Sequence, residues 1–250
     1  MLSDQELERY SRQLLMSDFD IEGQEKLQRA RVLVVGLGGL GSPAAIYMAC
    51  AGVGTLVLAD GDCVELSNLQ RQIAHSESDI GSNKAHSAAA SIASLNSAVA
   101  VEVVEKHLRE TDLPALLKKV DLVVDASDNY PIRYALNRAC IAGAIPLVSA
   151  AAVLAEGQLS VFDPAHGGPC YRCLYPQEGS ESALSCSQSG VLAPVVGVFG
   201  SLLAMEAVKV LSGYGNCLRG ALLLMDLKTM DVRRLSLSRR ENCPDCSHLQ

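Results

Sequence analysis

A glycine-rich segment followed by an acidic residue gives this sequence its first chemical signal. Segment 36–41 contains Gly36, Gly38, Gly39 and Gly41, and without side chains their backbone N–H groups can approach a phosphate. Apolar residues 32–35 before it predict a buried strand. A second apolar run, 55–59, ends on Asp60, where nucleotide-binding folds place a carboxylate that binds ribose. A lone glycine motif is weak evidence, but strand, glycines, helix, strand and acid in this order predict nucleotide binding.

The polar segment after Asp60 carries side chains that suit a triphosphate. Its members are Asp62, Asn68, Arg71, Gln72 and Lys84. Arginine and lysine hold phosphate charge, and asparagine can orient an oxygen. Lys84 falls in the first turn of a helix predicted over 82–95, where a cation opposes the helix dipole unless an anion lies nearby. A dinucleotide enzyme would not need this cluster, whereas an enzyme acting on a triphosphate would.

Asp128 is a candidate metal ligand. It lies just past a strand predicted over 121–125, and Mg²⁺ binds one or two carboxylates together with phosphate oxygens. Aspartate and asparagine also cap helices, and a helix is predicted over 130–142. Both roles fit the sequence, with Asp128 as the magnesium ligand and Asn129 as the cap.

Two C-x-x-C pairs, Cys170 with Cys173 and Cys243 with Cys246, predict a structural zinc site. Four thiolates would leave no open position for catalysis. The alternative is a redox pair, but redox C-x-x-C motifs open a helix after a strand, whereas these pairs lie among prolines and glycines. Cys186 lies in a long polar loop, either as an inert thiol or as a nucleophile on a flexible segment.

Composition sets the broad class. The 250 residues are 49% hydrophobic and carry a formal charge of −7, which allows a large core and argues against a nucleic-acid partner. No signal-peptide pattern is recognised, so the nine cysteines favour a reducing cytoplasm. The apolar stretch 191–205 contains Pro194 and is soon followed by charged residues, which predicts a buried helix rather than a membrane span.

The pattern of strands and helices predicts an α/β fold. Strands at 32–35, 55–59, 101–104, 121–125 and 146–151 alternate with helices, which is typical of a Rossmann-like, doubly wound, mostly parallel sheet. Strands at 157–162, 221–226 and 232–237 extend it antiparallel. We expect one domain over 1–250, with a helical arm (1–30), a nucleotide-binding core (31–155), and an extension (156–250) that holds a crossover loop and the zinc site.

The arm is predicted to be one helix over residues 3–16 with an apolar face. Its Arg9 and Arg12 are either solvated charges, the usual fate of arginines on a helix face, or part of an arm that reaches a site elsewhere.

Taken together, these motifs resemble the E1-like sulfur-carrier adenylyltransferases of the HesA/MoeB/ThiF family. The resemblance rests on GLGGLG at 36–41, the block from Asp60 that ends in SNLQRQ, Lys84, SDN at 127–129 and the paired cysteines. It runs from Arg9 to Cys246. It implies ATP-dependent adenylylation of the C-terminal glycine of a ubiquitin-fold sulfur carrier, with release of pyrophosphate, for thiocarboxylate formation in molybdopterin or thiamin biosynthesis.

The resemblance also implies roles for individual residues. The nucleotide-binding set is Gly36, Gly38, Gly39, Gly41, Asp60, Asp62, Ser67, Asn68, Leu69, Gln70, Arg71, Gln72, Lys84, Asp128 and Asn129. The catalytic set is Arg12, Arg71, Lys84 and Asp128, with Cys186 as an uncertain member because its thiol bonds to the carrier in only part of the family. Arg12 would reach the γ-phosphate from the other protomer of a homodimer. No rhodanese domain is recognised, so we expect a separate sulfur donor.

Two other functions are weighed against this one. The glycine loop alone permits an NAD-dependent oxidoreductase, but we find no hydride-transfer acid or base. A non-catalytic E1-like scaffold is disfavoured because Arg12, Arg71, Lys84 and Asp128 are all present. The expected cofactors are thus ATP, Mg²⁺ and Zn²⁺, and the expected partner is a MoaD-like or ThiS-like carrier, with no nucleic acid and no membrane.

Overall fold

Eight strands carry the fold in the computed structural model, which describes residues 2–176 and 190–249. They are β1 (Arg31–Val35), β2 (Thr55–Ala59), β3 (Ala100–Val104), β4 (Leu122–Asp125), β5 (Leu147–Val153), β6 (Glu156–Phe162), β7 (Ala221–Asp226) and β8 (Asp231–Ser236). The helices are α1 (Asp4–Arg9), α2 (Ser11–Leu14), α3 (Asp20–Arg29), α4 (Gly41–Ala51), α5 (Lys84–Leu95), α6 (Leu113–Leu117), α7 (Tyr130–Gly143), α8 (Tyr171–Leu174) and α10 (Ala193–Ser212). Short 3₁₀ turns are η1 (Leu66–Asn68), η2 (Glu77–Asp79), η3 (Glu110–Asp112) and η4 (Pro164–His166).

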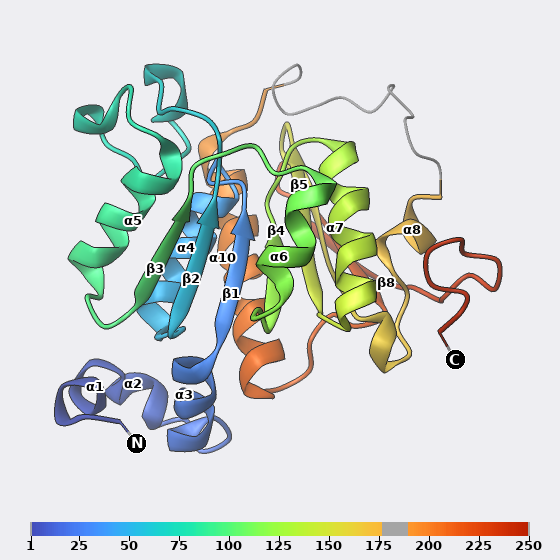
Figure 1. Cartoon of the computed structure of the whole chain (residues 1–250), viewed down its shortest axis with the longest axis horizontal. Helices are drawn as coiled ribbons and strands as arrows, with labels where there is room; N and C mark the ends of the chain where they lie inside the picture. The colour runs from blue at the N-terminus through green and yellow to red at the C-terminus, as the bar shows by residue number, and fades with distance from the viewer. Residues whose placement is uncertain (1, 177–189, 250) are drawn as a thin grey trace.

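The strands form one sheet in the order β3-β2-β1-β4-β5-β6-β7-β8 (Figure 1). Strands β3, β2, β1, β4 and β5 pair in parallel, and β6, β7 and β8 continue the sheet antiparallel. The predicted doubly wound sheet with an antiparallel extension is therefore confirmed. Its order reverses between β1 and β4, and in open α/β sheets ligands bind at such a switch point, beyond the carboxyl ends of the strands.

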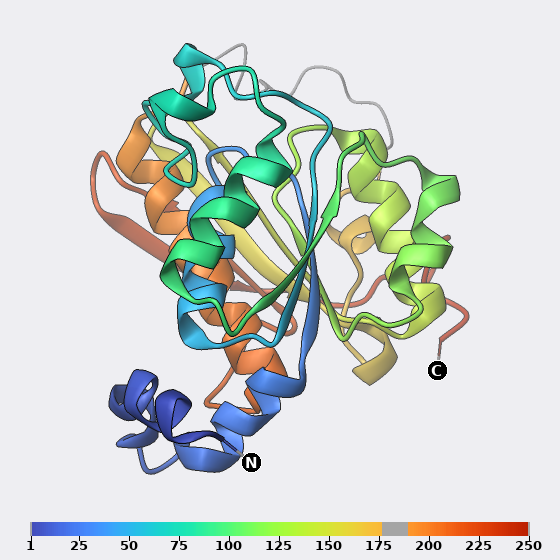
Figure 2. The same ribbon diagram turned by 60° about the vertical axis from the view of Figure 1, so that its left-hand side comes forward.

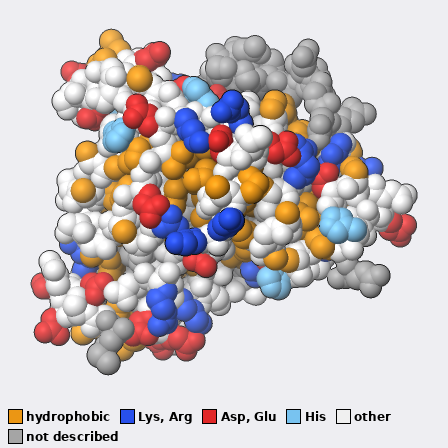
Figure 3. All heavy atoms as spheres, viewed as in Figure 1, with side chains coloured by type: hydrophobic (Ala, Val, Ile, Leu, Met, Phe, Trp, Pro, Cys, Tyr) orange, Lys and Arg blue, Asp and Glu red, His pale blue; other side chains and the backbone are white. Residues whose placement is uncertain are grey.

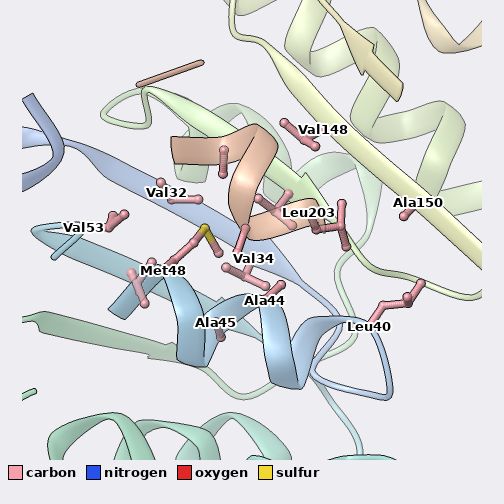
Figure 4. Packing of buried hydrophobic residues seen from close by; sticks show 14 of the residues in the cluster. Val32, Val34, Leu40, Ala44, Ala45, Met48, Val53, Val148, Ala150 and Leu203 are labelled. Atoms are coloured by element: carbon pink, nitrogen blue, oxygen red, sulfur yellow. The ribbon is translucent and has the colours of Figure 1, made fainter. Parts of the chain in front are cut away.

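Helices cover both faces of the parallel strands (Figures 1 and 2). On one face, Val32 and Val34 of β1 pack with α4, α5 and α10, as the close view of Met48 and Leu203 shows (Figure 4). On the other face, Leu33 of β1 packs with α6 and α7. Because successive residues of a strand point to opposite faces, a strand buried on both sides needs the continuous apolar run that the sequence supplies.

Helix α10 is the apolar helix predicted from the sequence. By length and composition it could cross a membrane, but 50% of its apolar stretch is buried in the structure. It packs along α4 and against β5 and β6. This packing supports the prediction that its apolar residues serve the protein core.

The join between β1 and α4 explains two of the predicted glycines. Gly36 has a φ of +87°, and a Cβ there would lie 2.8 Å from the carbonyl oxygen of Ala126. A Cβ at Gly41 would lie 1.8 Å from the carbonyl oxygen of Gly36. Glycine is therefore required at both positions, so that the loop can turn and the helix can begin directly against it.

The amino-terminal arm differs from its prediction. The single helix expected over 3–16 is broken at Tyr10 into α1 and α2. The Tyr10 ring is buried against Gly52, and its hydroxyl accepts a hydrogen bond from Asn96 Nδ2 at 2.9 Å. The predicted apolar face is buried only at Tyr10, since Leu7 and Leu15 are exposed, and the first helix ends at this tertiary contact. Figure 1 places the arm at the opposite end of the sheet from the carboxyl ends of the parallel strands.

Candidate active site

An open cleft of about 1980 Å³ lies beyond the carboxyl ends of β1, β2 and β4. Small-molecule sites commonly have volumes of about 300–1,000 Å³, so this cleft has room for a nucleotide and part of a second substrate. It extends from the glycine loop to Ala151 on β5 and Gly157 on β6. The predicted site residues that line it are Gly36, Gly38, Gly39, Asp60, Asp62, Asn68, Arg71, Gln72, Lys84, Asp128 and Asn129.

The glycine loop offers free backbone donors to this cleft. Within the described residues, the N–H groups of Gly38 and Gly39 make no hydrogen bond to the protein. A Cβ at Gly38 would meet only Gln72 Nε2, at 3.7 Å, so this glycine is not crowded by the protein. Because Leu40 N-caps α4, the loop leads directly into a helix N-terminus. Unpaired N–H groups beside a helix N-terminus form an anion-binding site.

Asp60 ties the loops of β1 and β2 together. Its Oδ2 accepts a hydrogen bond from the backbone N–H of Leu37 at 2.7 Å, and its Oδ1 accepts one from Asp62 at 2.8 Å. The sequence predicted a ribose ligand here. The structure places Asp60 at the cleft and adds a second task, which is to hold the glycine loop in position.

Lys84 is held at the cleft by Asp62. The Lys84 side chain is only 8% exposed, and its Nζ lies 2.9 Å from Asp62 Oδ2. Lys84 opens α5, as predicted, and Asn83 caps this helix by accepting a hydrogen bond from the backbone N–H of Ala85. The Asp62 carboxylate thus supplies the anion that makes a cation tolerable at this helix end.

The segment after β2 contributes only part of what was predicted. Arg71 faces the cleft, and its Nη1 donates to the carbonyl oxygen of Ser67 at 3.0 Å. The Asn68 Oδ1 accepts from the backbone N–H of Glu65 at 3.1 Å, which orients its amide. Gln72 is buried beside Gly38, and its Oε1 has no partner within the described residues. The predicted residues outside the cleft lining are Gly41, Ser67, Leu69 and Gln70.

Asp128 and Asn129 are exposed where β4 meets α7, at the edge of the cleft. Asn129 caps α7, because its Oδ1 accepts a hydrogen bond from the backbone N–H of Ile132 at 3.1 Å. Within the described residues the Asp128 carboxylate makes no hydrogen bond or ion pair with another side chain. It is therefore available to a ligand.

The four paired cysteines meet away from the cleft. Their sulfur atoms lie within 4.8 Å of one another, and the closer pairs are separated by 3.5 to 3.8 Å. Four thiolates about 2.3 Å from a tetrahedral zinc lie about 3.8 Å apart, so the cluster has the dimensions of a zinc site. The fold thus brings together two pairs that are far apart in the sequence.

Side chains around the cluster fasten it to α7. Asp245, between the second pair, accepts from Arg172 Nη1 at 2.9 Å and from Asn137 Nδ2 at 2.8 Å. Cys170 does open a helix, as the N-cap of α8, but this helix follows the 3₁₀ turn η4 rather than a strand. That helix has a single turn, and the second pair lies against it. The clustering of all four sulfurs, rather than the absence of a helix, is what favours a metal.

Comparison with known proteins identifies the family. The model of the ThiF family matches residues 10–245. This chain belongs to the ThiF family. Molybdopterin-synthase adenylyltransferase of Escherichia coli (strain K12) is 48% identical over 245 residues, which are 98% of each chain. The adenylyltransferase and sulfurtransferase MOCS3-2 of Zea mays is 49% identical over 96% of this chain and 49% of its own length. Escherichia coli MccB, solved with ATP, superposes with a TM-score of 0.85 at 25% identity, over 95% of this chain and 73% of that chain.

Two members of the predicted catalytic set of this ThiF-family chain are not among the residues that line the described cleft. Arg12 is exposed on α2, in the arm, and does not line it. Helix α2, which carries Arg12, lies in the arm at the opposite end of the sheet from the cleft of its own chain (Figure 1). Cys186 lies outside the described residues.

Sequence analysis missed a buried ion pair beneath the Asp128 loop. The fully buried Asp125 carboxylate accepts hydrogen bonds from Ser127 Oγ at 2.5 Å and Ser149 Oγ at 2.6 Å. Arg133 Nε lies 3.7 Å from Asp125, and its Nη2 donates to the Ser127 carbonyl oxygen at 2.5 Å. Burial alone would lower the pKa of Arg133, but the Asp125 charge and nearby tyrosines raise it above its ordinary value. The signal was available, since an aspartate ends an apolar strand and an arginine follows on the helix after it.

Proposed function

We propose that this chain catalyses ATP-dependent adenylylation of the C-terminal glycine of a ubiquitin-like sulfur-carrier protein. The observation that carries the proposal is that this chain is 48% identical to a molybdopterin-synthase adenylyltransferase over 98% of the length of both proteins. The cleft supports it independently, because free N–H groups of the glycine loop lie at the same opening as Lys84 and Arg71. A molybdopterin-pathway carrier of the MoaD type is the first candidate, and a thiamin-pathway carrier of the ThiS type is the second.

The residues of the cleft suit transfer of AMP to a carboxylate. The carrier's C-terminal carboxylate attacks the α-phosphate of ATP, its oxygen forms the new P–O bond, and the bond to pyrophosphate breaks. A carboxylate is already ionised at neutral pH, so the reaction needs no general base. It needs stabilisation of the negative charge on the phosphates, which Arg71, Lys84 and the glycine-loop amides can supply.

The Asp128 carboxylate fits a magnesium ligand. It is exposed, faces the cleft and is not used by another side chain within the described residues. Mg²⁺ is bound in nucleotide sites by one or two carboxylates together with phosphate oxygens, and when bound it neutralises phosphate charge. We assign Asp128 this role and leave Asn129 as the helix cap.

Zinc in the cysteine cluster would be structural. The sulfur spacing matches tetrahedral zinc, and four thiolates leave no position for a substrate. The cluster holds the C-terminal segment against α7 and α8 through Asp245. Its expected contribution is therefore to the stability of this side of the molecule.

A homodimer completes the proposal. Arg12 does not line its own cleft, and α2 lies at the opposite end of the sheet, so its proposed contact with the γ-phosphate requires the arm of a second copy. A separate sulfur donor would then convert the carrier adenylate to a thiocarboxylate, in the cytoplasm.

Other functions receive less support. An NAD-dependent oxidoreductase has no need of Lys84 and Arg71 beside the glycine loop. A nucleic-acid partner is disfavoured by the formal charge of −7 and by the mixture of acidic and basic side chains on the face seen in Figure 3. A non-catalytic scaffold would have no reason to retain an unpaired carboxylate at Asp128.

The decisive test is ATP–pyrophosphate exchange with MoaD-like and ThiS-like carriers supplied in turn. We expect exchange with one carrier and none with the same carrier lacking its C-terminal glycine. Exchange with a ThiS-like carrier alone would assign the chain to the thiamin pathway. No exchange with either carrier, while each supports exchange by its own adenylyltransferase, would overturn the proposal.

A further inference from the structure

His75 is a buried, titratable residue with no role assigned so far. Its side chain is 8% exposed and lies behind the glycine loop, outside the lining of the cleft. Nε2 lies 3.1 Å from the carbonyl oxygen of Leu37, and Nδ1 lies 2.8 Å from the hydroxyl of Ser87. Both ring nitrogens are therefore used, and both partners belong to elements that form the nucleotide site.

The two partners lie on separate elements. Leu37 is within the glycine loop, and its backbone N–H is the group that Asp60 holds. Ser87 is on α5, one turn after Lys84. A second bond ties α5 to the segment that carries His75, because Ser91 Oγ donates to the carbonyl oxygen of Ala74 at 2.6 Å. The His75 ring thus spans the gap between the loop that presents amides and the helix that presents a cation.

The hydrogen bonds place a proton on Nε2. A carbonyl oxygen only accepts, so Nε2 donates to Leu37, while Nδ1 pairs with the Ser87 hydroxyl, which can donate or accept. Burial lowers the pKa of His75 and nearby Lys84 lowers it further, while the Leu37 carbonyl, Asp60 and Asp79 oppose this. The lowered pKa favours the neutral ring, in which Nδ1 accepts from Ser87.

We propose that His75 is a positioning residue, which holds the glycine loop and the Lys84 helix at a fixed separation so that both contact one triphosphate. This inference rests on the proposed function, because it presumes that the cleft binds ATP. His75 would contact no substrate atom. Its effect is to hold the free N–H groups of Gly38 and Gly39 and the Lys84 ammonium in fixed relative positions before the phosphates bind.

The test compares affinities for ATP and for adenosine, which lacks the phosphates, by calorimetry well below the unfolding temperature. His75→Leu removes both hydrogen bonds of the ring and leaves the Leu37 carbonyl with the Ser42 hydroxyl, at 2.9 Å, as its remaining side-chain donor. We expect the ratio of ATP to adenosine affinity to fall by about tenfold or more. His75→Gln places an amide N–H near the position of Nε2 and should keep the ratio within about threefold of wild type.

His75→Asn is the matched control, since its shorter amide reaches Ser87 but not Leu37. Its ratio of ATP to adenosine affinity should fall as much as that of His75→Leu. Ile92→Ala, at a buried position of α5, controls for loss of stability. It should lower the unfolding temperature and leave the ratio of ATP to adenosine affinity unchanged. If His75→Leu fails to fold, the Asn and Gln pair decides the matter. Equal ratios in Asn, Gln and wild type would overturn the inference alone. A wild-type protein that binds no ATP would overturn it together with the proposed function.

Discussion

Single residues in the cleft divide into those that the protein itself uses and those left for a ligand. The Asp60 carboxylate accepts hydrogen bonds from two backbone N–H groups, and Lys84 is paired with Asp62. Asp128 is exposed and has no side-chain partner within the described residues. Since the first two have structural tasks as well as proposed ligand contacts, Asp128 offers the clearest test of chemistry at this scale.

Substituting Asp128 should abolish catalysis without unfolding the protein. Asp128→Ala and the isosteric Asp128→Asn both remove the charge that would bind Mg²⁺, and loss of such a ligand costs several kcal/mol in the transition state. We expect carrier-dependent pyrophosphate exchange to fall by at least about 100-fold, with an unchanged circular dichroism spectrum. Exchange within about tenfold of wild type would contradict the assignment.

The buried Asp125–Arg133 pair predicts a stability effect instead. Arg133→Met leaves the Asp125 carboxylate buried and without its counter-ion, which typically costs about 3–5 kcal/mol. Urea unfolding should show this loss. The control is Lys26→Met, which breaks an exposed ion pair with Glu22 and should change stability by less than about 0.5 kcal/mol. An Arg133→Met protein as stable as the control would show that Asp125 is not charged in the folded state.

At the scale of elements, the strands and helix caps that depend on neighbouring residues could be predicted from the sequence. The strands β1, β2 and β4 followed from apolar runs, and the cap of α7 followed from Asn129 beside a helical period. The break at Tyr10 was missed because its cause, burial against Gly52 and Asn96, lies far away in the sequence. The Asp125–Arg133 pair was missed for a different reason: each charge by itself resembles an ordinary strand end or helix face.

The cysteine cluster supplies the prediction at this scale. Purified protein should contain one zinc per chain, and Cys173→Ser should lower both the zinc content and the unfolding temperature. ATP affinity should change little, because none of the four cysteines lines the cleft. Elemental analysis and thermal unfolding measure the two effects. Metal-free native protein, or a disulfide between any two of the four cysteines, would reverse the assignment.

At the scale of the whole molecule, the arm and the cleft lie at opposite ends of one sheet (Figures 1 and 2). The arm is nevertheless firmly attached, since Arg9 Nη1 donates to the carbonyl oxygen of Leu95 at 2.8 Å and Gln13 donates to that of Ala51 at 3.0 Å. It cannot swing to its own cleft without losing these bonds and the burial of Tyr10. If Arg12 serves catalysis at all, it must serve the cleft of another copy.

Complementation between two inactive variants tests this arrangement. In a heterodimer of Arg12→Ala and Asp128→Ala chains, one cleft has an intact Asp128 from its own chain and receives the intact Arg12 of its neighbour. The other cleft lacks both. Activity should therefore reappear on mixing, up to about half of the wild-type value per heterodimer, because a long cation is readily extended from a packed helix toward a neighbouring chain. If native mass spectrometry shows heterodimers and pyrophosphate exchange stays absent, Arg12 does not act across the interface.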